Sequence, residues 1–122
     1  MIRIFTSKTQ KVGERGEKIA MQFLQKHGFT IIEQNYSARY GEIDIVAQNG
    51  DMLYLVEVKS QNINTTINPF ENLTPKKIRS LTVMTQIYIE HKKWEGDYRL
   101  IGCLVRLDDI NRRALVETID LA

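Results

Sequence analysis

The sequence has a single cysteine, Cys103, and therefore cannot form an intrachain disulfide. It also contains no apolar run approaching the ~20 residues that a membrane-spanning helix needs. Residues 1–6 lack the long apolar stretch of a secretory signal. These absences argue against a secreted or membrane-spanning protein, and we expect a cytoplasmic one.

A strong charge of either sign is also missing. Lys and Arg total 17 against 15 Asp and Glu, which gives a formal net charge of +2. This is too small for a protein that coats nucleic acid, so any DNA binding must depend on where the charges lie. The 122 residues are 43% hydrophobic and 26% charged, as in an ordinary globular protein. We predict one domain over residues 1–122, large enough to bury a single core.

The local patterns predict an α/β chain in the order α-β-β-β-α-β-β. Apolar residues at helical spacing, with Gly28 after them, indicate a first helix. Thr74-Pro75 is typical of a second helix start, an N-cap followed by proline. The expected helices are residues 11–27 and 74–95; the expected strands are 29–35, 43–47, 52–59, 98–107 and 114–119, with a long loop at 61–73. This order predicts one mixed sheet flanked by helices.

Asn49-Gly50 separates the second and third expected strands and is a strong local signal for a β-hairpin. If these two residues form the turn, Glu42 lies opposite Glu57, and Asp44 lies opposite Leu55. Because side chains alternate between faces, one side of the hairpin should carry Glu42, Asp44, Leu53, Leu55, Glu57 and Lys59.

Three carboxylates on one face are unfavourable, since facing like charges destabilise a sheet by about 0.2–1 kcal/mol per pair. A divalent cation removes the conflict, and Mg²⁺ or Mn²⁺ suits oxygen ligands from Glu42, Asp44 and Glu57. The alternative is a solvated outer face on which Lys59 neutralises Glu57. The pattern therefore indicates either a metal site or an exposed charged face.

Two motifs on this hairpin resemble a known nuclease signature. GEIDIVA at residues 41–47, followed by LVEVK at 55–59, resembles the Asp, then Glu-x-Lys, signature of the PD-(D/E)XK nucleases. More narrowly, the chain resembles the YraN family (UPF0102), which is related to archaeal Holliday junction resolvases by fold and motif. GERGEKIA at 13–20 is similar to that family's Gly-x-x-Gly-Glu-x-x-Ala helix, and ENLTPKKI at 71–78 is similar to the start of its later helix. The resemblance covers nearly the whole chain and implies a restriction-endonuclease-like fold.

This resemblance implies a metal-dependent endonuclease that cuts branched or structured DNA, as in DNA recombination and repair. Asp44 and Glu57 would be metal ligands, and Lys59 would orient or activate the attacking water. Glu17 would complete the catalytic site from the first helix. Its spacing from Ala20 and Leu24 puts it on their inward face, although an acid near a helix start can instead pair with the helix dipole. The junction resolvases need two active sites, which points to a homodimer.

The chain departs from the family pattern at two positions. Gln61 stands where the family often has arginine, and Ile101 stands where it often has aspartate. Neither belongs to the metal triad, so both bear on substrate contacts rather than on metal binding. Two other functions stay open: a DNA-binding module without catalysis, and a protein-interaction domain whose acidic patch contacts a basic partner.

Lys76, Lys77 and Arg79 lie in the first turns of the second helix, where the helix dipole disfavours cations. Together with the free amides of the helix N-terminus, they form a candidate DNA phosphate-binding site. The alternative is a solvated basic face. Cys103, on an apolar strand, is expected to be buried and unreactive.

Overall fold

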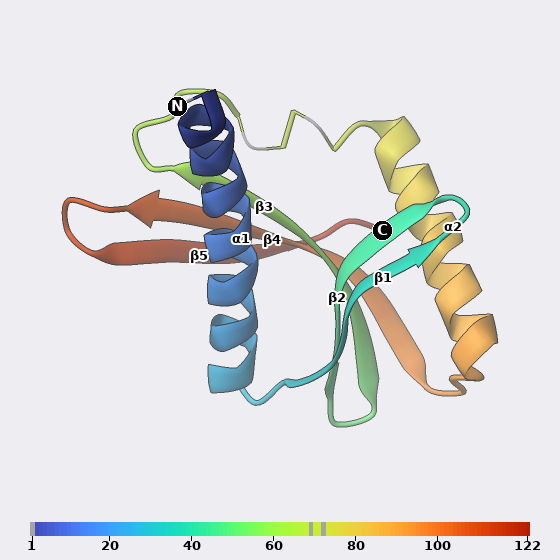
Figure 1. Cartoon of the computed structure of the whole chain (residues 1–122). Helices are drawn as coiled ribbons and strands as arrows, with labels where there is room; N and C mark the ends of the chain where they lie inside the picture. Colours follow the sequence, from blue (N-terminus) through green and yellow to red (C-terminus); the bar gives the residue numbers. More distant parts are fainter. Residues whose placement is uncertain (1, 69, 72) are drawn as a thin grey trace.

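The computed structural model describes residues 2–68, 70–71 and 73–122, with side chains from residue 12 onward. Met1, in the N-terminal segment, and Asn72, in the helix-start motif, lie outside the described residues. The predicted order α-β-β-β-α-β-β is confirmed (Figure 1). The elements are α1 (Ile2–Lys26), β1 (Thr30–Ala38), β2 (Gly41–Asn49), β3 (Met52–Asn62), α2 (Pro75–Lys92), β4 (Asp97–Asp108) and β5 (Arg113–Asp120).

The first helix is longer than predicted, since α1 begins at Ile2 rather than near residue 11. The second helix begins as predicted. The Thr74 side chain accepts a hydrogen bond from the backbone N–H of Lys77 at 3.2 Å, and proline occupies the first turn. This N-cap holds the start of α2 in a defined place.

The five strands form one sheet in the order β1-β2-β3-β4-β5. β3 and β4 are parallel, and the other neighbours are antiparallel. The parallel pair requires a crossover, which α2 and the segments on either side of it provide. In Figure 1, α1 and α2 lie on opposite sides of the sheet.

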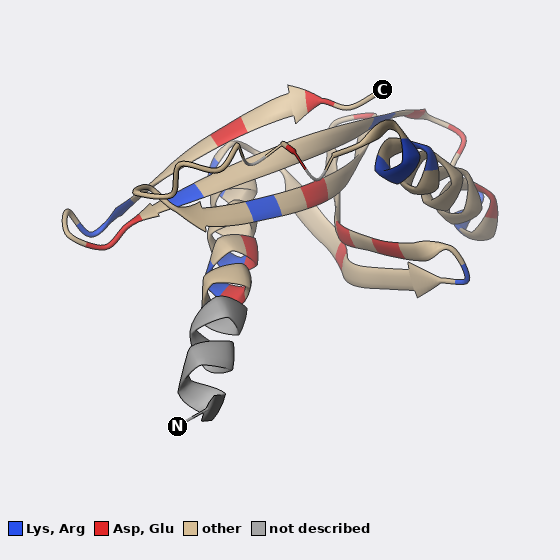
Figure 2. Ribbon diagram, turned by 90° about the horizontal axis from the view of Figure 1, so that it is seen from above, with Lys and Arg blue, Asp and Glu red and all other residues tan. Residues whose placement is uncertain are grey.

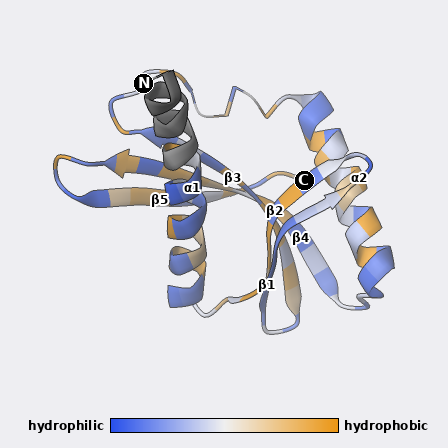
Figure 3. Cartoon of the chain, viewed as in Figure 1, coloured by the Kyte–Doolittle hydropathy of each residue, from blue (hydrophilic) through white to orange (hydrophobic). Residues whose placement is uncertain are grey.

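Each helix packs its own apolar cluster against the sheet. The α1 cluster includes Ala20 and Leu24 with Val56 and Val58 of β3, and the α2 cluster includes Met84 and Tyr88 with Leu55. Hydrophobic segments accordingly run along the strands between the helices (Figure 3). Cys103 is 1% exposed in the α1 cluster, as expected. Within the part of the chain that the structure describes, no helix is long and apolar enough to cross a membrane.

The predicted pairing of the β2–β3 hairpin was wrong by two residues. Asn49 pairs with Met52, so Gly50 and Asp51 form the turn in place of Asn49-Gly50. Gly50 adopts a φ of 62°, a conformation that glycine reaches without strain. Neither Glu42–Glu57 nor Asp44–Leu55 is a facing pair. Within the paired part, residues 45–49 of β2, a shift of two residues changes the partners but keeps each side chain on the same face.

The β2–β3 ladder ends at the pair Ile45–Val56, and from there toward its start β2 diverges from β3. The regular alternation of β2 also breaks here, because Ile43 and Val46 both pack in the α2 cluster while Ile45 packs in the α1 cluster. We call the opening between residues 41–44 of β2 and 57–60 of β3 the fork. Figure 1 shows β1 and β2 leaning away from the rest of the sheet.

Candidate functional site

Asp44 lies at the fork, where the backbone ladder stops. Its Oδ2 atom accepts a hydrogen bond from the backbone N–H of Val58 at 2.7 Å. The side chain thus provides an acceptor for a β3 amide at the point where β2 diverges. This contact anchors the carboxyl group at the fork.

Asp44 and Glu57 form a carboxyl pair. Burial, a hydrogen bond with Glu57 and the Glu57 charge together raise the pKa of Asp44 to about 8, while the Val58 amide acts in the opposite direction. Glu57 is only 5% exposed. Two acids this close and this poorly hydrated favour one shared proton over two negative charges. The pair can therefore share a proton, and its oxygens are of the type that divalent cations bind.

The cation that pairs with Glu57 comes from α2. The Lys77 Nζ atom lies 3.4 Å from Glu57 Oε2, and the Glu57 side chain is 6% exposed against 42% for Lys77. The sequence alternative gave the neutralising role to Lys59, but the ion pair seen is with Lys77. Lys77 is therefore committed to the site, unlike its exposed neighbours Lys76 and Arg79. Figure 2 shows the basic segment at the start of α2.

A pocket of about 370 Å³ opens beside the pair. It joins the fork to the face of α1 and is lined by Val12, Gly13, Glu17, Glu42, Asp44, Val58, Lys59 and Ser60. Partial burial, followed by the charges of Glu42 and Glu57, raises the pKa of Glu17. The structure thus brings Glu17 from α1 to the hairpin carboxylates. Glu42 stands at the exposed rim, where its Oε2 accepts from Ser37 Oγ at 3.4 Å.

The approach of α1 to the fork depends on Gly16. A Cβ atom at this position would lie 2.5 Å from the Ser60 Cβ and would also overlap the Ser60 hydroxyl. At Gly13, one turn earlier, a Cβ would meet nothing within 4 Å. Gly16 therefore lets the helix touch β3 and carries Glu17 to the pocket. The two glycines of the 13–20 motif have different packing environments.

The acidic groups fit a divalent cation that keeps part of its water shell. Among the residues whose side chains are described, no three His, Cys, Asp or Glu groups converge into a ready metal cage. Asp44 and Glu57 offer two close carboxylates. Mg²⁺ is commonly held by one or two carboxylates, with water and substrate phosphate completing the shell. Glu42 lines the same pocket as Asp44, at its exposed rim.

Arg106 is a candidate residue that the sequence analysis missed. It lies opposite Gln61 in the parallel β3–β4 ladder, and Leu104, two residues earlier, lies opposite Lys59. In the described structure, the Arg106 Nε atom is buried without a hydrogen-bond partner. Gln61, which stands where the family often has arginine, thus faces Arg106 on the next strand. No local pattern could reveal this, because it depends on the register of strands joined by a long crossover.

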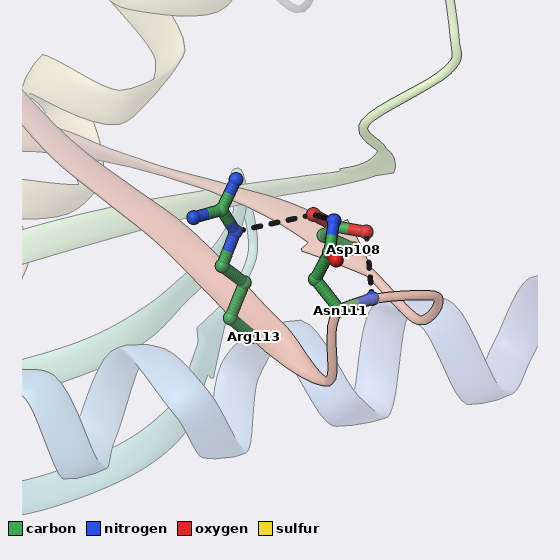
Figure 4. A network of polar contacts seen from close by, with 3 residues as sticks. All are labelled: Asp108, Asn111 and Arg113. Atoms are coloured by element: carbon green, nitrogen blue, oxygen red, sulfur yellow. Dashed lines mark hydrogen bonds and ion pairs between the residues drawn. The ribbon is translucent and has the colours of Figure 1, made fainter.

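Two other polar features lie outside the fork. The first is an ion pair between Arg99 and Asp120 at 3.5 Å. Ile101, close by on β4, is not polar and is 7% exposed in the α1 cluster. At the β4–β5 turn, Asp108 accepts from the Asn111 side chain at 2.8 Å and from Arg113 Nε at 3.1 Å (Figure 4). The Asn111 hydrogen bonds and Arg113 hold the pKa of Asp108 below its usual range. This network fastens the β4–β5 turn.

The fold and the site define a small α/β protein with paired acids at a fork in a mixed sheet. Residues 16–112 match the model of the "Uncharacterised protein family UPF0102", and the chain belongs to this family. The matched range contains the fork, all of α2 and strands β1–β4, whereas β5 follows it.

Several curated relatives share most of their length with this chain. A "UPF0102 protein" of Helicobacter hepaticus is 36% identical over 109 residues, covering 89% of this chain and 94% of the relative. One from Sulfurovum sp. (strain NBC37-1) is 36% identical over 99 residues, covering 80% and 86%. One from Wolinella succinogenes is 42% identical over 81 residues, covering 66% and 72%. Their names assign no activity.

Proposed function

We propose that this protein is a cytoplasmic, divalent-metal-dependent endonuclease that hydrolyses phosphodiester bonds of branched or structured DNA. The observation that carries the proposal is the buried Asp44–Glu57 pair at the fork, whose Asp44 lines one pocket with Lys59. A buried pair of acids costs stability, so a sequence selected only for folding would be expected to avoid it. The resemblance of these residues to the Asp, Glu-x-Lys signature gives the pair a use.

Asp44 and Glu57 would hold Mg²⁺ or Mn²⁺. Such a cation, when bound, polarises the phosphate and lowers the pKa of water. The Val58 amide fixes the orientation of Asp44, at 2.7 Å from Oδ2. Glu17 would add a carboxylate from α1 on the far side of the pocket, where it can hydrogen-bond water that reaches the cation.

Lys59 would act on the attacking water and on charge that develops on the phosphate. It lines the pocket, and it does not form the Glu57 ion pair, which Lys77 occupies. An ammonium group placed where negative charge develops stabilises the transition state more than the ground state. Lys59 is therefore the residue whose loss should affect rate far more than binding.

The DNA backbone would cross the start of α2 and the adjacent sheet. Lys76 and Arg79 are exposed on the first turns of α2, beside the helix N-terminus. Donors spaced around a metal site hold the phosphates that flank a scissile bond without reading sequence. Resemblance to junction resolvases supports a branched substrate and a homodimer with two sites.

The test is cleavage of labelled DNA junctions, flaps, duplexes and single strands with Mg²⁺, with Mn²⁺ and with EDTA. Lys59→Ala should lower the rate by about 10²–10³-fold while folding and DNA affinity stay near those of the native protein. Lys26→Ala, at the exposed end of α1, is the matched control and should cleave normally. A native protein that cuts none of these substrates with either metal would refute the proposal.

A DNA-binding module without catalysis is the second candidate function. It is favoured by the departures at Gln61 and Ile101, the latter being buried rather than available to substrate. Under this function, the cleavage panel would be negative while salt-dependent DNA binding remained. An acidic patch that binds a basic protein partner would show neither cleavage nor salt-dependent DNA binding.

A further inference from the structure

We infer that Lys77 is a built-in cation that neutralises Glu57 of the carboxyl pair until a divalent metal displaces it. The inference rests on the proposed function, since it describes how the same site is kept before metal arrives. It assigns Lys77 a role distinct from that of Lys76 and Arg79, with which the sequence groups it. The observation behind it is the 3.4 Å contact between Lys77 Nζ and the buried Glu57.

The burial of the two partners is unequal. The Glu57 side chain is 6% exposed and the Lys77 side chain 42%. If Lys77 moved away and nothing replaced it, Glu57 would be a buried, unpaired negative charge, which is strongly unfavourable. Lys77, by contrast, has water within reach and a flexible stem. The carboxylate is fixed and the ammonium is the exchangeable member of the pair.

The positions of the two groups make the exchange direct. Lys77 approaches from α2, on one side of the sheet, and its backbone is held by the Thr74 cap. Asp44, which meets Glu57 at the fork, lines the open pocket. A divalent ion that enters this pocket would be held by Asp44 and Glu57 and would bring two positive charges where Lys77 brings one. Lys77 would then be repelled from Glu57, and its side chain can extend into solvent.

This exchange predicts that Lys77 lowers metal affinity, the opposite of what a residue that orients a ligand would do. The test is Mn²⁺ binding by calorimetry at fixed pH and low salt, on the native protein and three variants. Lys77→Met keeps the aliphatic stem and removes the competing charge. It should bind Mn²⁺ about tenfold more tightly, the factor of one charge-assisted contact to a buried acid. Lys77→Arg keeps the charge and should stay close to the native protein.

Lys76→Met is the matched control, because it removes one positive charge from the same helical turn at an exposed position. If Lys77 acts only through net charge, the two methionine variants will bind Mn²⁺ equally, and the inference fails. It also fails if Lys77→Met weakens binding, which would make Lys77 a support for the ligands.

A thermal-shift experiment provides a second readout. Without metal, Lys77→Met should melt below Lys76→Met, because Glu57 is left unpaired; saturating Mn²⁺ should close that gap. A gap that persists at saturating Mn²⁺ would show that Lys77 stays on Glu57, against the exchange. No Mn²⁺ binding by the native protein would instead overturn the proposed metal site itself, together with this inference.

Discussion

Replacing Asp44 by Asn tests whether the fork stores a proton that a metal must displace. The pKa of Asp44 is raised from 3.8 to about 8 by burial and by Glu57. Between these values the folded protein holds a proton that the unfolded chain releases, so the free energy of unfolding falls as pH rises. Above about pH 8 the loss is complete. Asparagine can still accept from the Val58 amide, but it carries no charge at any of these pH values.

The size of the effect follows from the interval between the two pKa values. Each pKa unit is worth about 1.4 kcal/mol, which sets an upper limit of roughly 6 kcal/mol. Water in the open pocket solvates the ionised pair, and the effective dielectric there is well above that of a dry interior. We therefore expect the free energy of unfolding of Asp44→Asn, relative to that of the native protein, to rise by roughly 2–3 kcal/mol from pH 5 to pH 9.

The assay is urea unfolding of both proteins across this pH range in EDTA, with Asp51→Asn, in the exposed β2–β3 turn, as the control. Saturating Mg²⁺ or Mn²⁺ at pH 8 should stabilise the native protein and have little effect on Asp44→Asn. If the free energies of unfolding of the native protein and of Asp44→Asn changed with pH in parallel, the reasoning would be refuted, because Asp44 would then titrate as an ordinary exposed acid.

Two further predictions concern the helices. Gly16→Ala should destabilise the protein by about 1–3 kcal/mol in chemical unfolding, because the added Cβ forces α1 away from Ser60. Gly13→Ala has open space and should be neutral or stabilising by up to ~1 kcal/mol; equal losses at both positions would argue against the close approach. Replacing Lys76 and Arg79 together by Ala should lower the salt dependence of DNA binding by about 2 in log–log slope, measured by fluorescence anisotropy. An unchanged slope would place the DNA-binding surface elsewhere.

The element order and the α2 start were predictable from sequence because their signals are local. Helical spacing of apolar residues, and Thr74-Pro75 as a cap followed by proline, require no knowledge of distant contacts. The same holds for the burial of Cys103 on an apolar strand. The hairpin was predicted but its pairing was wrong. Asn49-Gly50 and Gly50-Asp51 overlap in the sequence and are both typical turn residues, so the local sequence does not decide which pair forms the turn.

The composition of the site was determined in part by sequence. The close spacing of Asp44, Glu57 and Lys59 along a hairpin is enough to bring them near one another, whichever turn forms. Glu17 followed from helical periodicity and its family resemblance. Its actual approach needed the contact of Gly16 with Ser60, two residues far apart in the chain.

Tertiary structure alone decided the charge balance at the fork. Lys77 reaches Glu57 only because α2 crosses over the sheet, and Arg106 faces Gln61 only because β3 and β4 run parallel in one register. The raised pKa of Asp44 likewise comes from burial and a neighbour 13 positions away in the printed sequence. A sequence pattern specifies which groups a short segment carries. Their protonation and their partners depend on solvent exclusion and long-range packing, which only the folded chain creates.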